Sequence, residues 1–158
     1  MPDDFYDQTP EANILATESV MNTIKTAEIL FDRIGRLLRP LHVSSAGGLV
    51  LGILRDHGAM SPSELGERLI VTRATVTGLV DSLQAQGYVE RSPNPADRRG
   101  QVVRITPRGL TVIQQVRTII HRNEKAWLSA LSDDELRDYI ATLHRIQDSI
   151  DAVPDTEG

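Results

Sequence analysis

The sequence predicts a mostly helical α+β fold with one small β-hairpin, in which long helices flank a central unit. Apolar residues recur at helical spacing through most of the 158 residues. The proline- and glycine-containing stretch 92–100 lies between two short segments of β type, as in a hairpin. Cysteine is absent and no apolar run approaches twenty residues, so we expect no disulfide, no cysteine-ligated zinc and no membrane span.

Positive charge is concentrated in the middle of the chain, although the formal net charge is −5. Residues 72–108 hold six arginines against three acids, a local +3, so the remainder carries −8. A local excess of this kind matters more than the sum for a protein that contacts a polyanion. The acidic N-terminus argues against a targeting peptide, and we expect a cytoplasmic protein.

The N-terminal part predicts an arm followed by a long helix. Residues 1–12 contain two prolines and four acids and are expected to be extended or disordered. A helix is expected from Ile14 to about Leu38, and Pro40 ends it. Its apolar positions form one stripe at Val20, Ile24, Ala27, Phe31, Ile34 and Leu38, and a second at Ile14, Met21, Leu30 and Leu37. We favour a helix that also buries surface in a dimer over a plain core helix, because so short a chain makes a thin core.

The next helix is expected over about Ala46–Arg55, capped by Ser44 or Ser45. Its buried positions are expected to be Leu49, Val50, Ile53 and Leu54. Three glycines lie inside it, at 47, 48 and 52, and each costs about 0.8–1 kcal/mol relative to alanine in a helix. Close helix packing explains them slightly better than space left for a ligand, and both readings stay open.

Two short helices joined by a tight turn follow. Ser61 is the expected N-cap, Pro62 the first helical residue and Glu64 the partner in a capping box. The first helix runs to about Leu69, burying Leu65 and Leu69. Ile70 and Val71 make the turn, and Thr72 caps the second helix, within Val71–Leu83. That helix has an apolar face (Val76, Leu79, Val80, Leu83) and a face of Arg73, Thr75, Thr77 and Gly78. This arrangement is a helix-turn-helix.

A hairpin follows the second helix, which Gly87 ends. Strands are expected over Tyr88–Arg91 and Gln101–Ile105, with a loop over Ser92–Gly100 that its two prolines stiffen. The loop carries an Asp-Arg-Arg tip, so residues 44–106 predict a winged helix-turn-helix. Thr106-Pro107 then starts a helix with apolar residues Leu110, Ile113, Val116, Ile120, Trp127 and Leu131. A capping box at Ser132 begins the last helix, whose face is formed by Leu136, Ile140, Leu143, Ile146 (or Gln147) and Ile150.

From Ser61 to Val112 the chain resembles the MarR-type winged helix-turn-helix regulators. The resemblance is carried by SELGERL, TRATVTGLVDSLQAQGYVER, DRR in the hairpin and ITPRG, in that order. It implies a homodimeric transcriptional regulator whose dimerisation helices are 13–40 and 107–153. It also implies that two recognition helices would enter major grooves about 34 Å apart on a pseudo-palindromic operator. In this family the Asp of the hairpin motif, here Asp97, orients the second following Arg, here Arg99, for the minor groove.

The candidate DNA-contacting residues are Ser61, Ser63, Thr72, Arg73, Thr75, Thr77, Asp97, Arg98, Arg99 and Arg104. Arg73 and Thr75 would reach base edges from the start of the second helix. Ser61 and Ser63 lie at a helix N-terminus, where phosphate binds readily, although capping alone also explains Ser61. Thr72 and Thr77 suit phosphate contacts or caps. Arg104 would follow the DNA backbone or pair with Glu90. The role of Arg108 is undecided in the same way, between a contact with DNA and an ion pair within the protein.

The expected function is a repressor released by a small aromatic or anionic effector. A cleft for that effector would be lined by Leu38, His42, Gly47, Gly48 and Leu51. A winged helix used only for protein–protein assembly is the alternative. An enzyme is disfavoured, because the sequence has no phosphate loop, no HExxH and no nucleophile elbow. We expect no cofactor and no metal site.

Overall fold

The computed structural model describes residues 13–94 and 97–153, with side chains described for all of these except 97–99. The predicted arm at 1–12 lies outside the described residues. In chain order the elements are α1 (Ile14–Leu38), the 3₁₀ turn η2 (Arg39–Leu41), α2 (Ser45–His57), α3 (Pro62–Leu69), α4 (Arg73–Ala85), β1 (Val89–Asn94), β2 (Asp97–Ile105), α5 (Pro107–Trp127) and α6 (Asp133–Ala152). The predicted mostly helical fold with one antiparallel hairpin is confirmed. The chain divides into two compact units, one ending at Ile120 and one beginning at His121.

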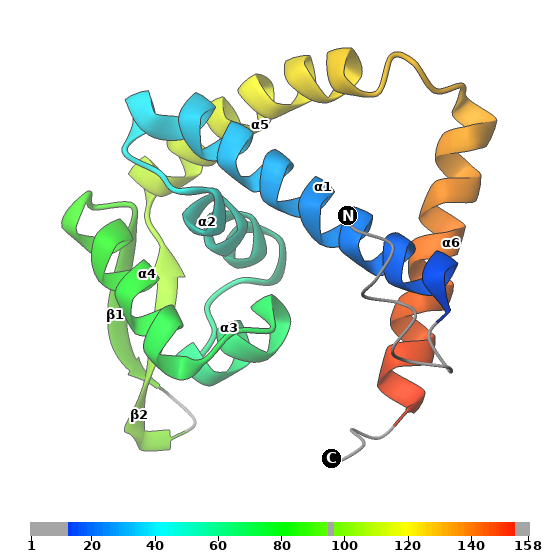
Figure 1. The fold of residues 1–158 in the computed structure, drawn as a ribbon. Coiled ribbons are helices and arrows are strands. Elements are labelled where there is room, and N and C mark those ends of the chain that lie inside the picture. The colour runs from blue at the N-terminus through cyan, green and yellow to red at the C-terminus, as the bar shows by residue number, and fades with distance from the viewer. Residues whose placement is uncertain (1–12, 95–96, 154–158) are drawn as a thin grey trace. The chain divides into compact units, whose positions relative to one another are not determined.

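The core of the first unit lies where α2, α3 and α4 meet each other and the hairpin (Figure 1). Its fully buried side chains are Leu38, Val50, Leu51, Leu54, Leu65, Val76, Val80, Leu83, Val89 and Val103. None of the described residues in this core is polar or charged. Removal of leucine and valine side chains from water is therefore the main force that holds the helix-turn-helix together.

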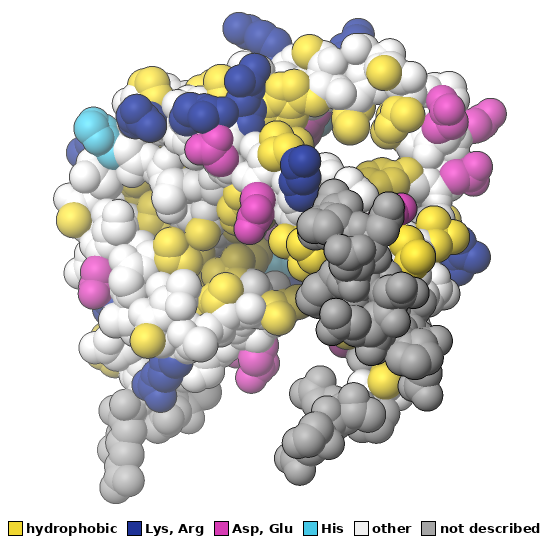
Figure 2. All heavy atoms as spheres, in the orientation of Figure 1, with side chains coloured by type: hydrophobic (Ala, Val, Ile, Leu, Met, Phe, Trp, Pro, Cys, Tyr) yellow, Lys and Arg dark blue, Asp and Glu magenta, His cyan; other side chains and the backbone are white. Residues whose placement is uncertain are grey.

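Helix α1 begins and ends at the two residues that the apolar pattern predicts. The side chain of Asn13, a cap that sequence reasoning missed, accepts a hydrogen bond of 3.1 Å from the Ala16 N–H. The helix stops at Leu38, two residues before Pro40, and η2 follows. Leu38 is the one described residue of α1 that is buried, and apolar residues of both stripes stay about half exposed. Hydrophobic side chains accordingly reach the surface over α1 and α2 in Figure 2.

Helix α2 corrects one sequence expectation. Leu49 is 49% exposed, whereas Leu51, which was not among the predicted core residues of this helix, is 0% exposed. The Ser44 hydroxyl caps the helix by accepting from the Gly47 N–H at 2.9 Å. A Cβ on Gly47 would lie 3.1 Å from the Ser44 hydroxyl oxygen, and one on Gly48 would lie 3.4 Å from Leu38. Close packing thus accounts for Gly47, whereas a Cβ on Gly48 would make only ordinary van der Waals contact.

The hairpin is longer than predicted, and the expected loop over Ser92–Gly100 is wrong. Strand β1 continues to Asn94 and β2 already begins at Asp97, with Pro93 opposite Gln101 and an irregularity after Pro93. A proline can occupy such a strand because one edge of each strand in a two-stranded sheet is unpaired, so that its missing N–H need not break the ladder. Backbone bonds between Met60 and Val103, of 3.1 and 2.8 Å, join the hairpin to the residues before α3.

Hydrogen bonds join the first turn of helix α5 to the residues just before β1. The Thr106 hydroxyl donates to the Gly87 carbonyl oxygen at 2.7 Å and accepts from the Gly109 N–H at 3.0 Å, which is the predicted cap. The Thr106 N–H donates to the Tyr88 carbonyl oxygen at 3.0 Å. A Cβ on Gly109 would overlap that same carbonyl oxygen, so the helix approaches the strand as closely as backbone allows.

The predicted apolar face of α5 needs correction at both of its ends. Leu110 and Leu131 are about 40% exposed, and Leu131 lies beyond the helix, which ends at Trp127. Val112, which was not in the predicted set, is buried instead, together with Ile113 and Val116.

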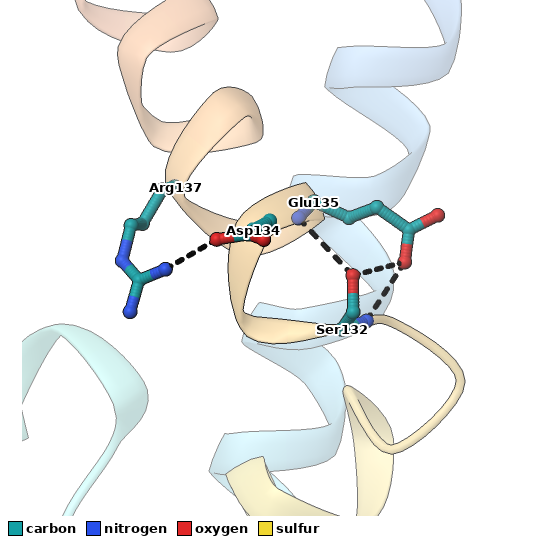
Figure 3. A network of polar contacts seen from close by, with 4 residues as sticks. All are labelled: Ser132, Asp134, Glu135 and Arg137. Atoms are coloured by element: carbon teal, nitrogen blue, oxygen red, sulfur yellow. Dashed lines mark hydrogen bonds and ion pairs between the residues drawn. The ribbon is translucent and has the colours of Figure 1, made fainter.

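The second unit contains α6, which begins with the predicted capping box (Figure 3). The Ser132 N–H donates to Glu135 Oε2 at 2.8 Å, and the Glu135 N–H donates to the Ser132 hydroxyl at 3.3 Å. Arg137 pairs with Asp134 at 2.5 Å one turn further. The hydrogen bonds from Ser132 lower the pKa of the Glu135 carboxyl below its ordinary value. These short-range contacts fix the start of the helix.

Within the described residues, no single helix is both long and apolar enough to cross a membrane. Judged by length and composition only, the bent pair Ile14–Leu41 and Ser45–His57, which meet at 76°, passes the same criterion.

Candidate nucleic-acid interface

Helix α4 presents the polar face that the sequence predicts. Thr72 precedes it, and the Thr72 hydroxyl oxygen accepts from the Thr75 N–H at 3.3 Å and lies 2.9 Å from the Thr75 hydroxyl. The Thr77 hydroxyl donates to the Arg73 carbonyl oxygen at 3.0 Å. All four side chains are exposed. A Cβ on Gly78 would meet no described atom within 4 Å, so the middle of this face has no bulk of its own.

The start of α3 lies close to the start of α4. The Ser61 hydroxyl accepts from the Glu64 N–H at 3.3 Å, and Glu64 Oε2 accepts from the Ser61 N–H at 2.7 Å, which confirms the predicted capping box. These bonds from Ser61 hold the pKa of Glu64 below its ordinary value. Ser63, Thr72 and Arg73 line one open depression of about 600 Å³ between the two helix starts. Three of the predicted contact residues are therefore brought together on one surface.

An arginine of the hairpin, Arg91, neutralises an acid on the exposed side of α4. Arg91 Nη2 lies 2.6 Å from Asp81 Oδ1, and Arg91 Nη1 donates to Gln84 Oε1 at 2.5 Å. Asp81 follows Thr77 by four residues and so lies on the same side of the helix. Its carboxylate would otherwise repel a polyanion at this face. The contact joins β1 to α4 across ten residues, and local sequence patterns carry no signal for it.

The remaining candidates lie on the hairpin. Arg104 is exposed and lies opposite Glu90 in the strand register. In the part of the chain that the structure describes, no ion pair joins the two, so the expected alternative of a cross-strand pair is not formed. The side chains of Asp97, Arg98 and Arg99 lie outside the described residues, although their backbone belongs to β2. The guanidinium carbon of Arg108 lies 5.5 Å from the centre of the Tyr88 ring, within reach of a cation–π contact.

The five residues named for an effector cleft lie around the start of α2. Leu38 and Leu51 are fully buried in the core, and Gly47 is buried against Leu83 and Val43. His42 is exposed and adopts the left-handed conformation, with φ of 54°. Gly48 is half-buried next to Leu38, and the effector role of the five residues stays a prediction.

Comparison with known proteins agrees with this geometry. Residues 43–100 match the model of the MarR family. The multiple antibiotic resistance protein MarR of Salmonella typhimurium is 37% identical over 78 residues, which are 49% of this chain and 54%, about half, of that protein. The transcriptional regulator PecS of Dickeya dadantii is 29% identical over 81% of this chain and 80% of its own length.

Solved structures extend the likeness beyond the matched residues. A crystal structure of a MarR mutant from E. coli, in complex with operator DNA, has a TM-score of 0.75 with 26% identity. The superposition covers 85% of this chain and 99% of that one, so the helices on either side of the hairpin unit are shared as well. Residues 43–100 therefore match the MarR family in sequence, and the fold resembles that of a MarR protein over most of the chain.

Proposed function

We propose that the chain is a homodimeric transcriptional regulator that binds a pseudo-palindromic operator in duplex DNA and acts as a repressor. The exposed polar face of α4 carries this proposal, because Arg73, Thr75 and Thr77 stand on a helix whose opposite face is buried. In a helix-turn-helix, the second helix enters a major groove of DNA with its exposed polar face. The likeness to a protein whose crystal structure contains operator DNA supports the same reading.

The contacts divide into base-reading and backbone-binding residues. Arg73 and Thr75, at the first turn of α4, suit base edges, and one bidentate contact of an arginine with guanine is worth about 1–3 kcal/mol of discrimination. Ser61, Ser63, Thr72 and Thr77 suit phosphates. Arg98, Arg99 and Arg104 would place positive charge against the DNA backbone or the narrow minor groove, and Asp97 would orient Arg99.

Exposed apolar side chains support a dimer. In the first unit, Val20, Ile24 and Phe31 of α1 are about half exposed, and in the second unit Ile140 and Ile150 of α6 are more than half exposed. Faces with so many large apolar residues favour a partner over water. A second copy of the chain is the partner that a pseudo-palindromic operator calls for. Phe31→Asp should therefore convert a dimer into a monomer in sedimentation equilibrium, and an unchanged mass would contradict this assignment.

DNA binding is tested by mobility shift on the DNA that flanks the protein's own gene. Arg73→Ala should weaken binding about ten- to a hundredfold and relax the choice of sequence, because a base contact is lost. Arg104→Ala should weaken binding to all sequences alike and reduce the salt slope by about one. Arg117→Ala, which changes an exposed arginine of α5, is the matched control and should leave affinity unchanged.

Equal affinity for the wild-type and both variants would refute the regulator and favour a winged helix used for protein–protein assembly. An effector of small aromatic or anionic character and a cytoplasmic location complete the proposal. The effector is tested by adding aromatic carboxylates to the same binding assay. A ligand can lower operator affinity only by its differential affinity for the unbound form, so the absence of any response would remove this part.

A further inference from the structure

Position 70, in the turn between α3 and α4, holds an exposed isoleucine in a backbone conformation that suits glycine. It is 92% exposed, the largest exposed fraction among the large hydrophobic side chains of the described residues. Its φ of 54° and ψ of 48° lie in the left-handed region, which is unfavourable for a β-branched side chain. The residue thus gains nothing from burial and is strained as well.

The turn itself would be served better by glycine. The Ile70 N–H donates to the Glu67 carbonyl oxygen at 3.3 Å, and the Val71 N–H donates to the Gly66 carbonyl oxygen at 3.1 Å. This pair of bonds closes a helix in the motif whose left-handed position is usually glycine. The turn explains the left-handed backbone but not the isoleucine, and a residue that keeps such strain marks a candidate functional position.

The surroundings of Ile70 indicate what it contacts. It lines the open depression together with Val71, Ser63, Thr72 and Arg73. Its exposed carbons are therefore continuous with the surface that we assign to the major groove, three residues before the arginine that would read a base. Arg73 and Glu67 are the charged residues among those that line the depression. We therefore expect duplex DNA to occupy this depression.

We propose that Ile70, with Val71 beside it, contacts the C5-methyl group of a thymine in the operator and so helps to choose the sequence. Thymine is the base that presents a methyl group in the major groove, and an apolar side chain recognises it by removing both surfaces from water. This inference rests on the proposed function, because it needs α4 to lie in the major groove.

The test uses the full-length protein and a duplex that it selects from a random library. Replacing thymine by uracil at one position after another removes the methyl group and nothing else. At one position in each half-site, this change should weaken wild-type binding about fourfold, the factor that burial of one such group is worth. Ile70→Gly should bind the thymine duplex about fourfold more weakly than wild type and should not respond to uracil at that position. Ile70→Val should keep most of the response.

Misfolding cannot mimic this result, because glycine suits the left-handed position and should raise the melting temperature. If no position responds to uracil, or if Ile70→Gly responds as the wild type does, the inference is wrong while the regulator proposal stands. If the wild type selects no sequence at all, the proposed function and this inference both fail.

Discussion

Arg91→Ala is the change that most directly probes how the hairpin is held against α4. Arg91 makes an ion pair with Asp81 and a hydrogen bond to Gln84. The side chain of Arg91 is 22% exposed and that of Asp81 is 60% exposed. A pair exposed to this degree is worth about 0.2–1 kcal/mol. The bond to Gln84 adds about 1 kcal/mol, since its donor is charged and partly shielded from water. We therefore expect the free energy of unfolding to fall by about 1–2 kcal/mol.

Urea denaturation followed by circular dichroism measures this loss. A double-mutant cycle with Asp81→Asn isolates the ion pair, and a second cycle with Gln84→Ala isolates the hydrogen bond. The coupling to Asp81 should shrink in about 1 M salt, where the Debye length is about 3 Å, and the coupling to Gln84 should persist. Zero coupling in both cycles would refute the assignment of Arg91 as the link.

DNA affinity gives a second readout, in which a second substitution should restore what the first one removes. Arg91→Ala leaves the Asp81 carboxylate unpaired on the side of α4 that we assign to DNA, so affinity should fall. Adding Asp81→Asn to that variant should restore much of the loss, although stability stays low. If the double variant binds no better than Arg91→Ala, charge neutralisation is not what Arg91 contributes to binding.

Three further predictions concern the fold. Gly109→Ala should lower the free energy of unfolding by about 3 kcal/mol in urea denaturation, because its methyl group would overlap a backbone oxygen that no rotamer change can move; a loss below about 1 kcal/mol would contradict this contact. Leu51→Ala should cost about 2–5 kcal/mol and Leu49→Ala about 0.5 kcal/mol or less, and equal costs would contradict the observed face of α2. The lowered pKa of Glu64 means that its contribution is present above the unfolded pKa and is lost as pH falls through the folded pKa. In urea titrations from roughly pH 6 to pH 3, Glu64→Gln should therefore lose less stability on acidification than the wild type; parallel curves would show that the bonds from Ser61 do not matter.

Helix boundaries were predictable wherever a cap or a proline acts within a few residues. Ser61, Thr72 and Ser132 cap their helices as expected, because each cap depends on a side chain and an amide three residues apart. The buried face of α2 was not predictable in the same way. Leu49, Val50 and Leu51 are consecutive apolar residues, and helical periodicity does not tell which two of three adjacent positions face inward.

The sequence predicts which residues of the candidate site lie on one helix face, but not the contacts that the site makes between separate elements. The polar face of α4 follows from spacing alone, and the structure confirms its exposure. The extended hairpin was missed because proline, asparagine and glycine favour loops on average, whereas Pro93 here lies in a strand with an unpaired edge. The Arg91 bridge was missed because it depends on how the hairpin packs against α4.

The contacts of Thr106 and Gly109 with the two residues just before β1 have a mechanical consequence. With its first turn bonded to Gly87 and Tyr88, α5 cannot tilt about that end without carrying the hairpin along or breaking these bonds. Within the first unit, the beginning of α5 therefore moves together with the hairpin. In the proposed dimer, a small change in the angle between the two α5 helices would alter the separation of the two hairpins. In the proposed regulator, the tilt of α5 would thus alter DNA affinity through the hairpins.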